Sequence, residues 1–138
     1  MNDTLRTVSI VRDSVGVYTA TNASGDALTF GQGDGLFSPV ELLLAALAGC
    51  AAIDVDVVTS RRAEPMSFEA TASGHKVIED GATRLADLDV AFRVRFGDDD
   101  QGRTAASMVD RLVRLSHDKD CTVSRTIEHA TPVAMHAD

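Results

Sequence analysis

The feature that most constrains the fold of this chain is an unbroken apolar run from Leu42 to Ile53, in which the thiol of Cys50 is the only polar side-chain group. Directly before it, residues 38–41 read Ser-Pro-Val-Glu. An N-cap serine, a proline at the first helical position and a glutamate at the third form a capping box. The sequence therefore predicts a helix over residues 38–60. Because a helix that is apolar on all sides has no polar face for solvent, we expect the rest of the protein to cover it.

Strand patterns lie on both sides of this helix. Before it, turn residues separate three short β-forming segments, at residues 5–12, 15–22 and 27–30. After it, residues 66–77 and 85–96 alternate apolar and polar side chains, and a polar loop joins them. Strands with one apolar and one polar face are typical of an antiparallel sheet that packs on helices.

The last part of the chain predicts a second helix and a final strand. Thr104 is placed as an N-cap, and the apolar side chains after it recur at helical spacing. Residues 116–120 end this helix, Cys121 follows, and residues 127–135 have strand character. The order of strands, buried helix, hairpin, amphipathic helix and strand predicts an α+β fold, as a single domain over residues 1–138.

Composition and charge exclude several classes of function. A net charge of −8 over 138 residues, with no clustered basic face, argues against a nucleic-acid partner. The apolar run is shorter than the ~20 residues that span a bilayer. The N-terminus lacks the basic-then-apolar pattern of a signal sequence, so we expect a cytoplasmic protein without a membrane partner. In a cytosolic chain, two cysteines are more often catalytic, redox-active or merely buried than a structural disulfide.

Cys50 and Cys121 are the residues best suited to chemistry. A reactive cysteine must be ionised and accessible, which requires a nearby cation or helix N-terminus. Cys50 lies in an apolar helix, and burial alone would make it inert, so the residues by themselves leave core packing open. Cys121 follows a helix end, where the amides of a new turn could lower its pKa. His117 could join both cysteines as a metal ligand, but no further ligand clusters with them, and we expect no metal.

Two segments carry a resemblance to a known family. SPVELLLAALAGC at residues 38–50, followed by a hairpin, a helix and CTVSRTI at residues 121–127, resembles the OsmC/Ohr family of osmotically induced and organic hydroperoxide resistance proteins. The resemblance implies antiparallel sheets wrapped around central buried helices, in an intertwined homodimer. It also implies a thiol peroxidase of oxidative or osmotic stress defence that needs no cofactor. Cys50 would attack the hydroperoxide, Cys121 would resolve it as a disulfide, and an external thiol would reduce that disulfide.

The resemblance further implies an arginine and a glutamate that poise the first thiolate. The family arginine comes from the N-terminal strands, where Arg12 is the best-placed residue and Arg6 the next. In the hydroperoxide-resistance branch the glutamate lies ten residues before the cysteine, where this chain has Val40, and the nearest carboxylate is Glu41. A shift of one residue along a helix rotates the side chain by about 100°, so Glu41 need not face the same way as the family glutamate. A capping role for Glu41 is favoured. The chain therefore resembles the broader OsmC-like group more than that branch.

Two other functions stay open from the sequence. A non-catalytic protein on the same fold would bind a small hydrophobic ligand in an apolar pocket beside Gly49, a glycine that is costly in a helix interior. Val40 favours this alternative, whereas the presence of both cysteines favours the enzyme. A redox sensor would use the same cysteine pair without turnover.

Overall fold

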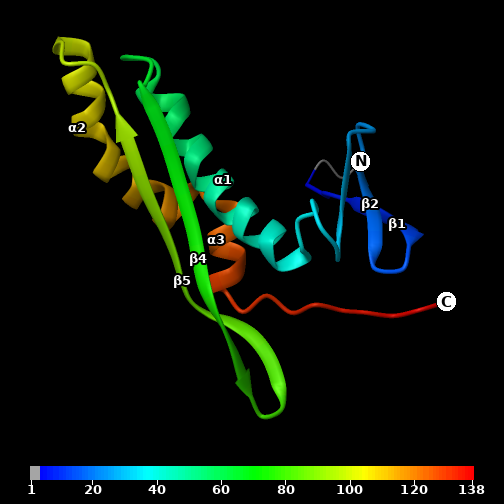
Figure 1. Ribbon diagram of the computed structural model, residues 1–138. Helices are drawn as coiled ribbons and strands as arrows, with labels where there is room; N and C mark the ends of the chain where they lie inside the picture. The colour runs from blue at the N-terminus through cyan, green and yellow to red at the C-terminus, as the bar shows by residue number, and fades with distance from the viewer. Residues whose placement is uncertain (1–3) are drawn as a thin grey trace. The chain divides into compact units, whose positions relative to one another are not determined.

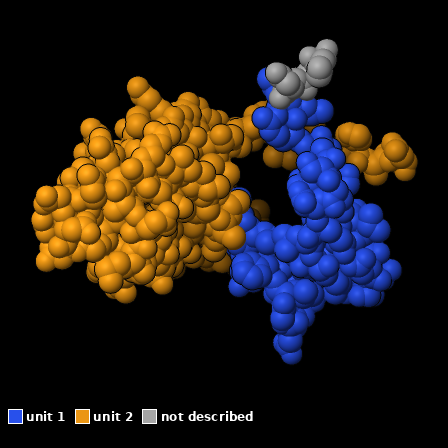
Figure 2. All heavy atoms as spheres, turned by 90° about the horizontal axis from the view of Figure 1, so that it is seen from above, with its two compact units in different colours: residues 1–43 blue, residues 44–138 orange. Residues whose placement is uncertain are grey.

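The computed structural model describes residues 4–138 and divides the chain into two compact units, residues 1–43 and 44–138 (Figure 2). Its elements confirm the predicted α+β class, and the single domain expected over residues 1–138 stays a prediction. In chain order the elements are β1 (Val8–Ser14), β2 (Val17–Asn22), β3 (Ala27–Gly31), α1 (Pro39–Thr59), β4 (Ser67–Glu79), β5 (Ala82–Arg95), α2 (Asp100–Leu115), the π turn η1 (Ser116–Asp120) and α3 (Thr122–Glu128) (Figure 1).

The first unit is built on a three-stranded antiparallel sheet in the order β1-β2-β3. Tyr18 of β2 lies opposite Arg12 of β1 and Phe30 of β3. The rings of Tyr18 and Phe30 are 6.0 Å apart between centroids, and Phe30 is buried. The three predicted strands are therefore present, although the first begins at Val8 rather than at residue 5.

Helix α1 begins at the predicted capping box. The Glu41 amide donates to Ser38 Oγ at 3.1 Å, and the Ser38 amide donates to Glu41 Oε1 at 2.9 Å. These two bonds satisfy donors that the first turn of a helix leaves unpaired.

The prediction that α1 is covered on all sides is wrong within one chain. Its buried side chains occupy a narrow face. Ile53 and Val57 on the remainder are 63% and 53% exposed. One chain has too few layers of secondary structure to surround a helix that is apolar all round, so much of its apolar surface has no cover.

Among residues 4–138, α1 is the one helix that is long and apolar enough to cross a membrane by length and composition. The apolar run of 12 residues is shorter than a membrane span, but the whole helix has 21 residues, so the length of α1 does not exclude a span. The central helix of a protein that never enters a membrane passes the same test. Glu41, Asp54 and Asp56 are three carboxylates within α1, and charged groups at membrane depth are costly.

The second unit contains the long antiparallel hairpin of β4 and β5, which lies alongside the helices in Figure 1. Exposure alternates along both strands as predicted, so the apolar side chains share one face. Phe68 and Phe92 meet edge to face on it, with ring centroids 6.1 Å apart. The register shifts between Ser73 and His75, opposite a stretch of β5 in which Asp87 has a φ of +55°.

Helix α2 starts earlier than the sequence predicts. Its N-cap is Asp99, whose carboxylate accepts the Gly102 amide at 2.7 Å. The predicted N-cap, Thr104, instead lies inside the first turns and donates its hydroxyl to the Asp100 carbonyl at 2.9 Å. An aspartate in extended conformation is a strong N-cap, so the helix is capped by Asp99 rather than by the threonine five residues later.

The predicted final strand over residues 127–135 is wrong. Cys121 starts the short helix α3 directly after η1, and Ile127 and Glu128 are its last residues. The residues after Glu128 form no further helix or strand. The local preference of this segment for strand gives way to the cap at Cys121 and to the packing of Ile127 into the second unit.

Candidate functional site

The π turn η1 delivers Cys121 to the centre of the second unit. The Cys121 amide donates to the Ser116 carbonyl five residues earlier, at 2.7 Å. Cys121 then serves as the N-cap of α3, where its Sγ accepts the Ser124 amide at 3.4 Å. The residue is only 1% exposed. The new turn that the sequence predicts after this cysteine is present.

Ser116 ties the π turn to helix α1. Its hydroxyl donates to Asp54 Oδ2 at 2.7 Å, although 62 residues separate the two in sequence. Ser116 is 1% exposed. The sequence does not predict this pair, because no spacing rule relates positions so far apart.

Cys50 lies in the middle of α1, half-buried, and interacts with the segment around Cys121. Burial raises the pKa of the Cys50 thiol above its ordinary value, and hydrogen bonding and charge interaction with the Cys121 side chain raise this pKa further. The backbone amides of Val123 and Thr122, in the first turn of α3, act in the opposite direction and lower the pKa. The structure therefore brings the two predicted cysteines together.

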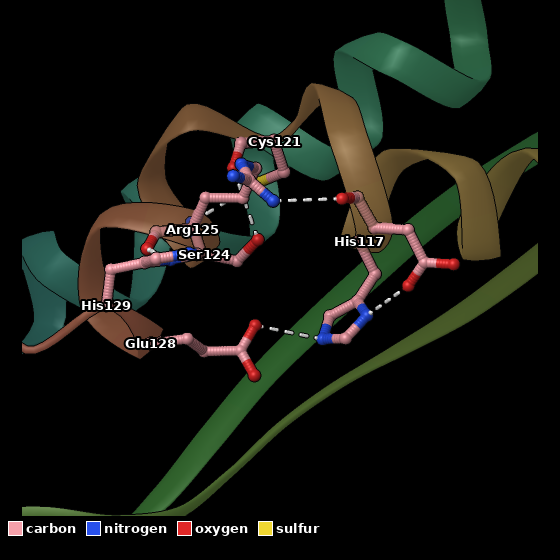
Figure 3. Close-up of polar contacts among 7 residues, drawn as sticks. His117, Cys121, Ser124, Arg125, Glu128 and His129 are labelled. Carbon is pink, nitrogen blue, oxygen red and sulfur yellow. Dashed lines mark hydrogen bonds and ion pairs between the residues drawn. The ribbon is translucent and has the colours of Figure 1, made fainter.

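An ion-pair chain lies beside Cys121 (Figure 3). Glu128 of α3 faces the ring of His117, with Oε1 3.0 Å from Nε2, and Asp118 Oδ1 lies 3.0 Å from Nδ1. The hydrogen bond to Asp118 and the charge of Glu128 raise the pKa of His117. Arg125 donates to the Asp118 carbonyl at 3.0 Å.

The arrangement around His117 differs from a metal centre. Both ring nitrogens face carboxylates rather than the cysteines considered as co-ligands. Among residues 4–138, no group of three or more histidine, cysteine or acidic side chains could hold a metal ion.

A cavity of about 280 Å³ lies in the second unit against Cys121. Its lining is mainly apolar and comes from α1, β5, α2, η1 and α3. The lining residues are Leu47, Ala51, Leu88, Asp89, Val90, Phe92, Val113, His117, Cys121, Ser124, Ile127 and Glu128. Gly49 itself does not line this cavity, although Leu47 and Ala51 on either side of it do, and the apolar pocket expected beside Gly49 stays a prediction.

The other two predicted site residues belong to the first unit. Arg12 lies on β1, exposed, with Tyr18 as its partner across the sheet. Glu41 lies in the first turn of α1, where its carboxylate caps the helix. Their predicted roles toward Cys50 stay predictions.

Three solved structures show the same fold at low sequence identity. A hypothetical protein from Aquifex aeolicus VF5 is 18% identical, with a TM-score of 0.72 over 92% of this chain and 89% of that one. An OsmC-like protein from Mycoplasma pneumoniae is 14% identical, with a TM-score of 0.70 over 94% and 92%. An organic hydroperoxide resistance protein OsmC and predicted redox protein from Legionella pneumophila is 14% identical, with a TM-score of 0.60 over 92% and 91%.

Comparison by sequence gives a family but no individual relative. No curated protein matches the chain. A family profile for OsmC-like proteins matches residues 31–136, which is most of the chain and includes both cysteines and the capping box. The sequence resemblance and the α+β architecture are thereby confirmed, and the chain belongs to the OsmC-like protein family.

Proposed function

We propose that this protein is a thiol peroxidase that reduces organic or inorganic hydroperoxides through a dithiol cycle of Cys50 and Cys121. The observation that carries the proposal is the interaction of these two side chains beside the first turn of α3. Membership of the OsmC-like family supports it. So does the likeness in fold to a Legionella pneumophila protein described as an organic hydroperoxide resistance protein.

The proposed cycle has two covalent steps. The Cys50 thiolate attacks the distal peroxide oxygen, so that an S–O bond forms, the O–O bond breaks, and the leaving alkoxide takes up a proton. Cys121 then attacks the sulfenic sulfur of Cys50. An S–S bond forms, the S–O bond breaks, and hydroxide leaves as water after protonation. An external thiol reduces the disulfide, and the cycle needs no metal or organic cofactor.

A cation must assist the first step, because burial and Cys121 both raise the pKa of Cys50. In this proposal Arg12 supplies that charge and stabilises the thiolate and the transition state. Glu41 is the carboxylate for holding this arginine. Its Oε1 accepts the Ser38 amide, which leaves Oε2 for that task.

The partner in the proposal is a second copy of the chain, in an intertwined cytoplasmic homodimer, with no nucleic-acid or membrane partner. The exposed apolar side chains of α1 and of the sheets support this. We expect a stable dimer at micromolar concentration in sedimentation, and a folded monomer under those conditions would contradict the proposal.

Intact-mass spectrometry of the wild-type protein tests the chemistry directly. After one equivalent of an organic hydroperoxide, we expect a loss of two hydrogen atoms, as an intramolecular disulfide forms. Alkylation before digestion should place that disulfide between Cys50 and Cys121. A protein that stays fully reduced under excess organic hydroperoxide would contradict the peroxidase.

A second candidate function is the binding of a small hydrophobic ligand without turnover. The mainly apolar cavity of about 280 Å³ favours it. Saturable binding of an apolar fluorescent probe, lost in Phe92→Asp, combined with no peroxide-dependent disulfide, would support this candidate over the enzyme. A redox sensor would form the disulfide but turn over slowly with any thiol reductant.

A further inference from the structure

Ser116 is a buried residue to which the proposed peroxide chemistry gives no role, yet it links the two segments that carry the cysteines. Its hydroxyl donates to Asp54 of α1 at 2.7 Å. Its carbonyl accepts the Cys121 amide, also at 2.7 Å. Ser116 is therefore hydrogen-bonded to α1 through its side chain and to Cys121 through its backbone carbonyl.

Asp54 lies on the Cys50 face of α1. The two residues are four positions apart in one continuous helix, and side chains at this spacing lie above one another, one turn apart. The hydrogen bond from Ser116 therefore fixes the start of η1 to α1 within one turn of Cys50. A short hydrogen bond to a carboxylate at a site with little solvent is strong for its class.

The geometry of η1 makes its first residue important for the orientation of Cys121. A π turn is rare, has poorer hydrogen-bond geometry than an α-helix, and is often found at functional sites. Ser116 is the buried residue of this turn, and its neighbours as far as Asp120 are exposed. The ion pair of His117 with Glu128 and the bond from Arg125 to the Asp118 carbonyl hold the turn to α3, whereas the hydrogen bond from Ser116 to Asp54 ties its start to α1, the helix that carries Cys50.

We propose that the Ser116–Asp54 pair positions Cys121 for attack on oxidised Cys50. This inference rests on the proposed dithiol function and concerns its second step only. Ser116 and Asp54 act through the backbone of Cys121 and take no part in bond making. The pair should therefore affect closure of the disulfide and leave the attack of Cys50 on the peroxide unchanged.

Equilibration with a glutathione redox buffer tests the positioning without any peroxide. In Ser116→Ala we expect the equilibrium constant for the Cys50–Cys121 disulfide to fall roughly tenfold, because the two thiols are held together less often. A tenfold change corresponds to about 30 mV in the reduction potential of a two-electron couple. The matched control is Ser60→Ala, which removes a serine–aspartate hydrogen bond of 2.9 Å to Asp56 near the end of α1. An unchanged constant in Ser116→Ala, or an equal fall in the control, would overturn the inference.

Single-turnover oxidation by tert-butyl hydroperoxide separates the two steps. In Ser116→Ala the rate of sulfenic acid formation at Cys50 should match that of the wild type, while disulfide formation should slow roughly ten- to hundredfold. Trapping with dimedone should then capture sulfenic acid in the variant, and excess oxidant should drive it to sulfinic acid. Equal disulfide rates would overturn the inference.

Substitution of Asp54 decides the question if Ser116→Ala does not fold. Asp54→Asn keeps an oxygen that can accept the Ser116 hydroxyl, whereas Asp54→Ala does not. We expect Asp54→Asn to restore most of the disulfide equilibrium that Asp54→Ala loses, and equal constants in both variants and the wild type would overturn the inference. A wild type that forms the disulfide with glutathione but not with peroxide would contradict the proposed function alone.

Discussion

The two cysteines have the same side chain but opposite backbone surroundings. Cys50 is half-buried in the middle of α1, where the helix itself uses every neighbouring amide, so the amides that lower its pKa belong to another segment, the first turn of α3. Cys121 is fully buried between a π turn and α3, where it accepts the amide of Ser124. In the proposed cycle, the backbone rather than the thiol distinguishes the attacking cysteine from the resolving one. Cys50 lies where a charge must be supplied from outside, and Cys121 lies where the local turn holds it in place.

The largest expected effect comes from exchanging either sulfur for oxygen. Cys50→Ser removes the nucleophile, so we expect no change in intact mass after one equivalent of organic hydroperoxide. Cys121→Ser keeps the nucleophile and loses the resolver, so it should gain one oxygen atom and stall as sulfenic acid. If Cys121→Ser stays unmodified while Cys50→Ser is oxidised, then Cys121 is the attacking cysteine and Cys50 the resolving one, which contradicts the proposal.

A smaller effect is expected from the cation that Cys50 needs. Arg12→Ala should raise the pKa of Cys50 and slow peroxide reduction at neutral pH at least tenfold. Stability should change by only about 0.5 kcal/mol, since Arg12 is exposed on β1. Stopped-flow rates and urea unfolding measure the two effects. Arg125→Ala is the control, and full activity in Arg12→Ala with loss in Arg125→Ala would move the assignment to Arg125.

The influence of one thiol on the other should be directly measurable. Hydrogen bonding and charge from Cys121 both raise the pKa of Cys50, so Cys121→Ser, which keeps a helix-capping side chain, should lower that pKa. Burial remains in the variant, so the value should stay above that of a free thiol. The pH dependence of iodoacetamide alkylation at Cys50 measures it. A pKa of Cys50 that stays unchanged or rises in Cys121→Ser would contradict the prediction.

The smallest expected effect is a pH dependence of stability from His117. Asp118 and Glu128 raise the folded-state pKa of His117 above the ordinary 6.5, so the protonated ring favours the folded protein. This stabilisation is complete below pH 6.5 and disappears as the pH rises through the raised pKa. The side chain is mostly exposed, so solvent limits the effect to about 0.5 kcal/mol. Urea midpoints across this range should change less in His117→Gln than in the wild type, and identical profiles would contradict the prediction.

Local patterns in the sequence predict most of the fold. The capping box at Ser38 and Glu41 and the alternation along residues 85–96 are short-range signals, and both are confirmed. The N-cap of α2 and the final strand were predicted wrongly. The carboxylate of Asp99 caps α2 in place of Thr104. Cys121 acts as an unusual N-cap and starts α3, which includes the first residues of the expected strand.

The candidate site is less predictable than the fold. The family resemblance links Cys50 to Cys121, and the structure brings their side chains together. Ser116 and Asp54 carry no sequence signal, because their hydrogen bond joins positions 62 residues apart. The interaction of Cys50 with the first turn of α3 joins positions more than 70 residues apart, so no local pattern predicts it.

The π turn η1 also bears on which insertions and deletions this chain tolerates. An α-helical turn closes with one residue fewer, so deleting the exposed Lys119 would let η1 join α2 as regular helix. Regular helix is the more favourable backbone, and the shortened protein should fold well. The Cys121 amide would then reach the same Ser116 carbonyl as an ordinary i→i−4 bond, so the deletion should leave Cys121 close to its present place. A screen for disulfide formation should therefore accept the same deletion that a screen for thermal stability accepts.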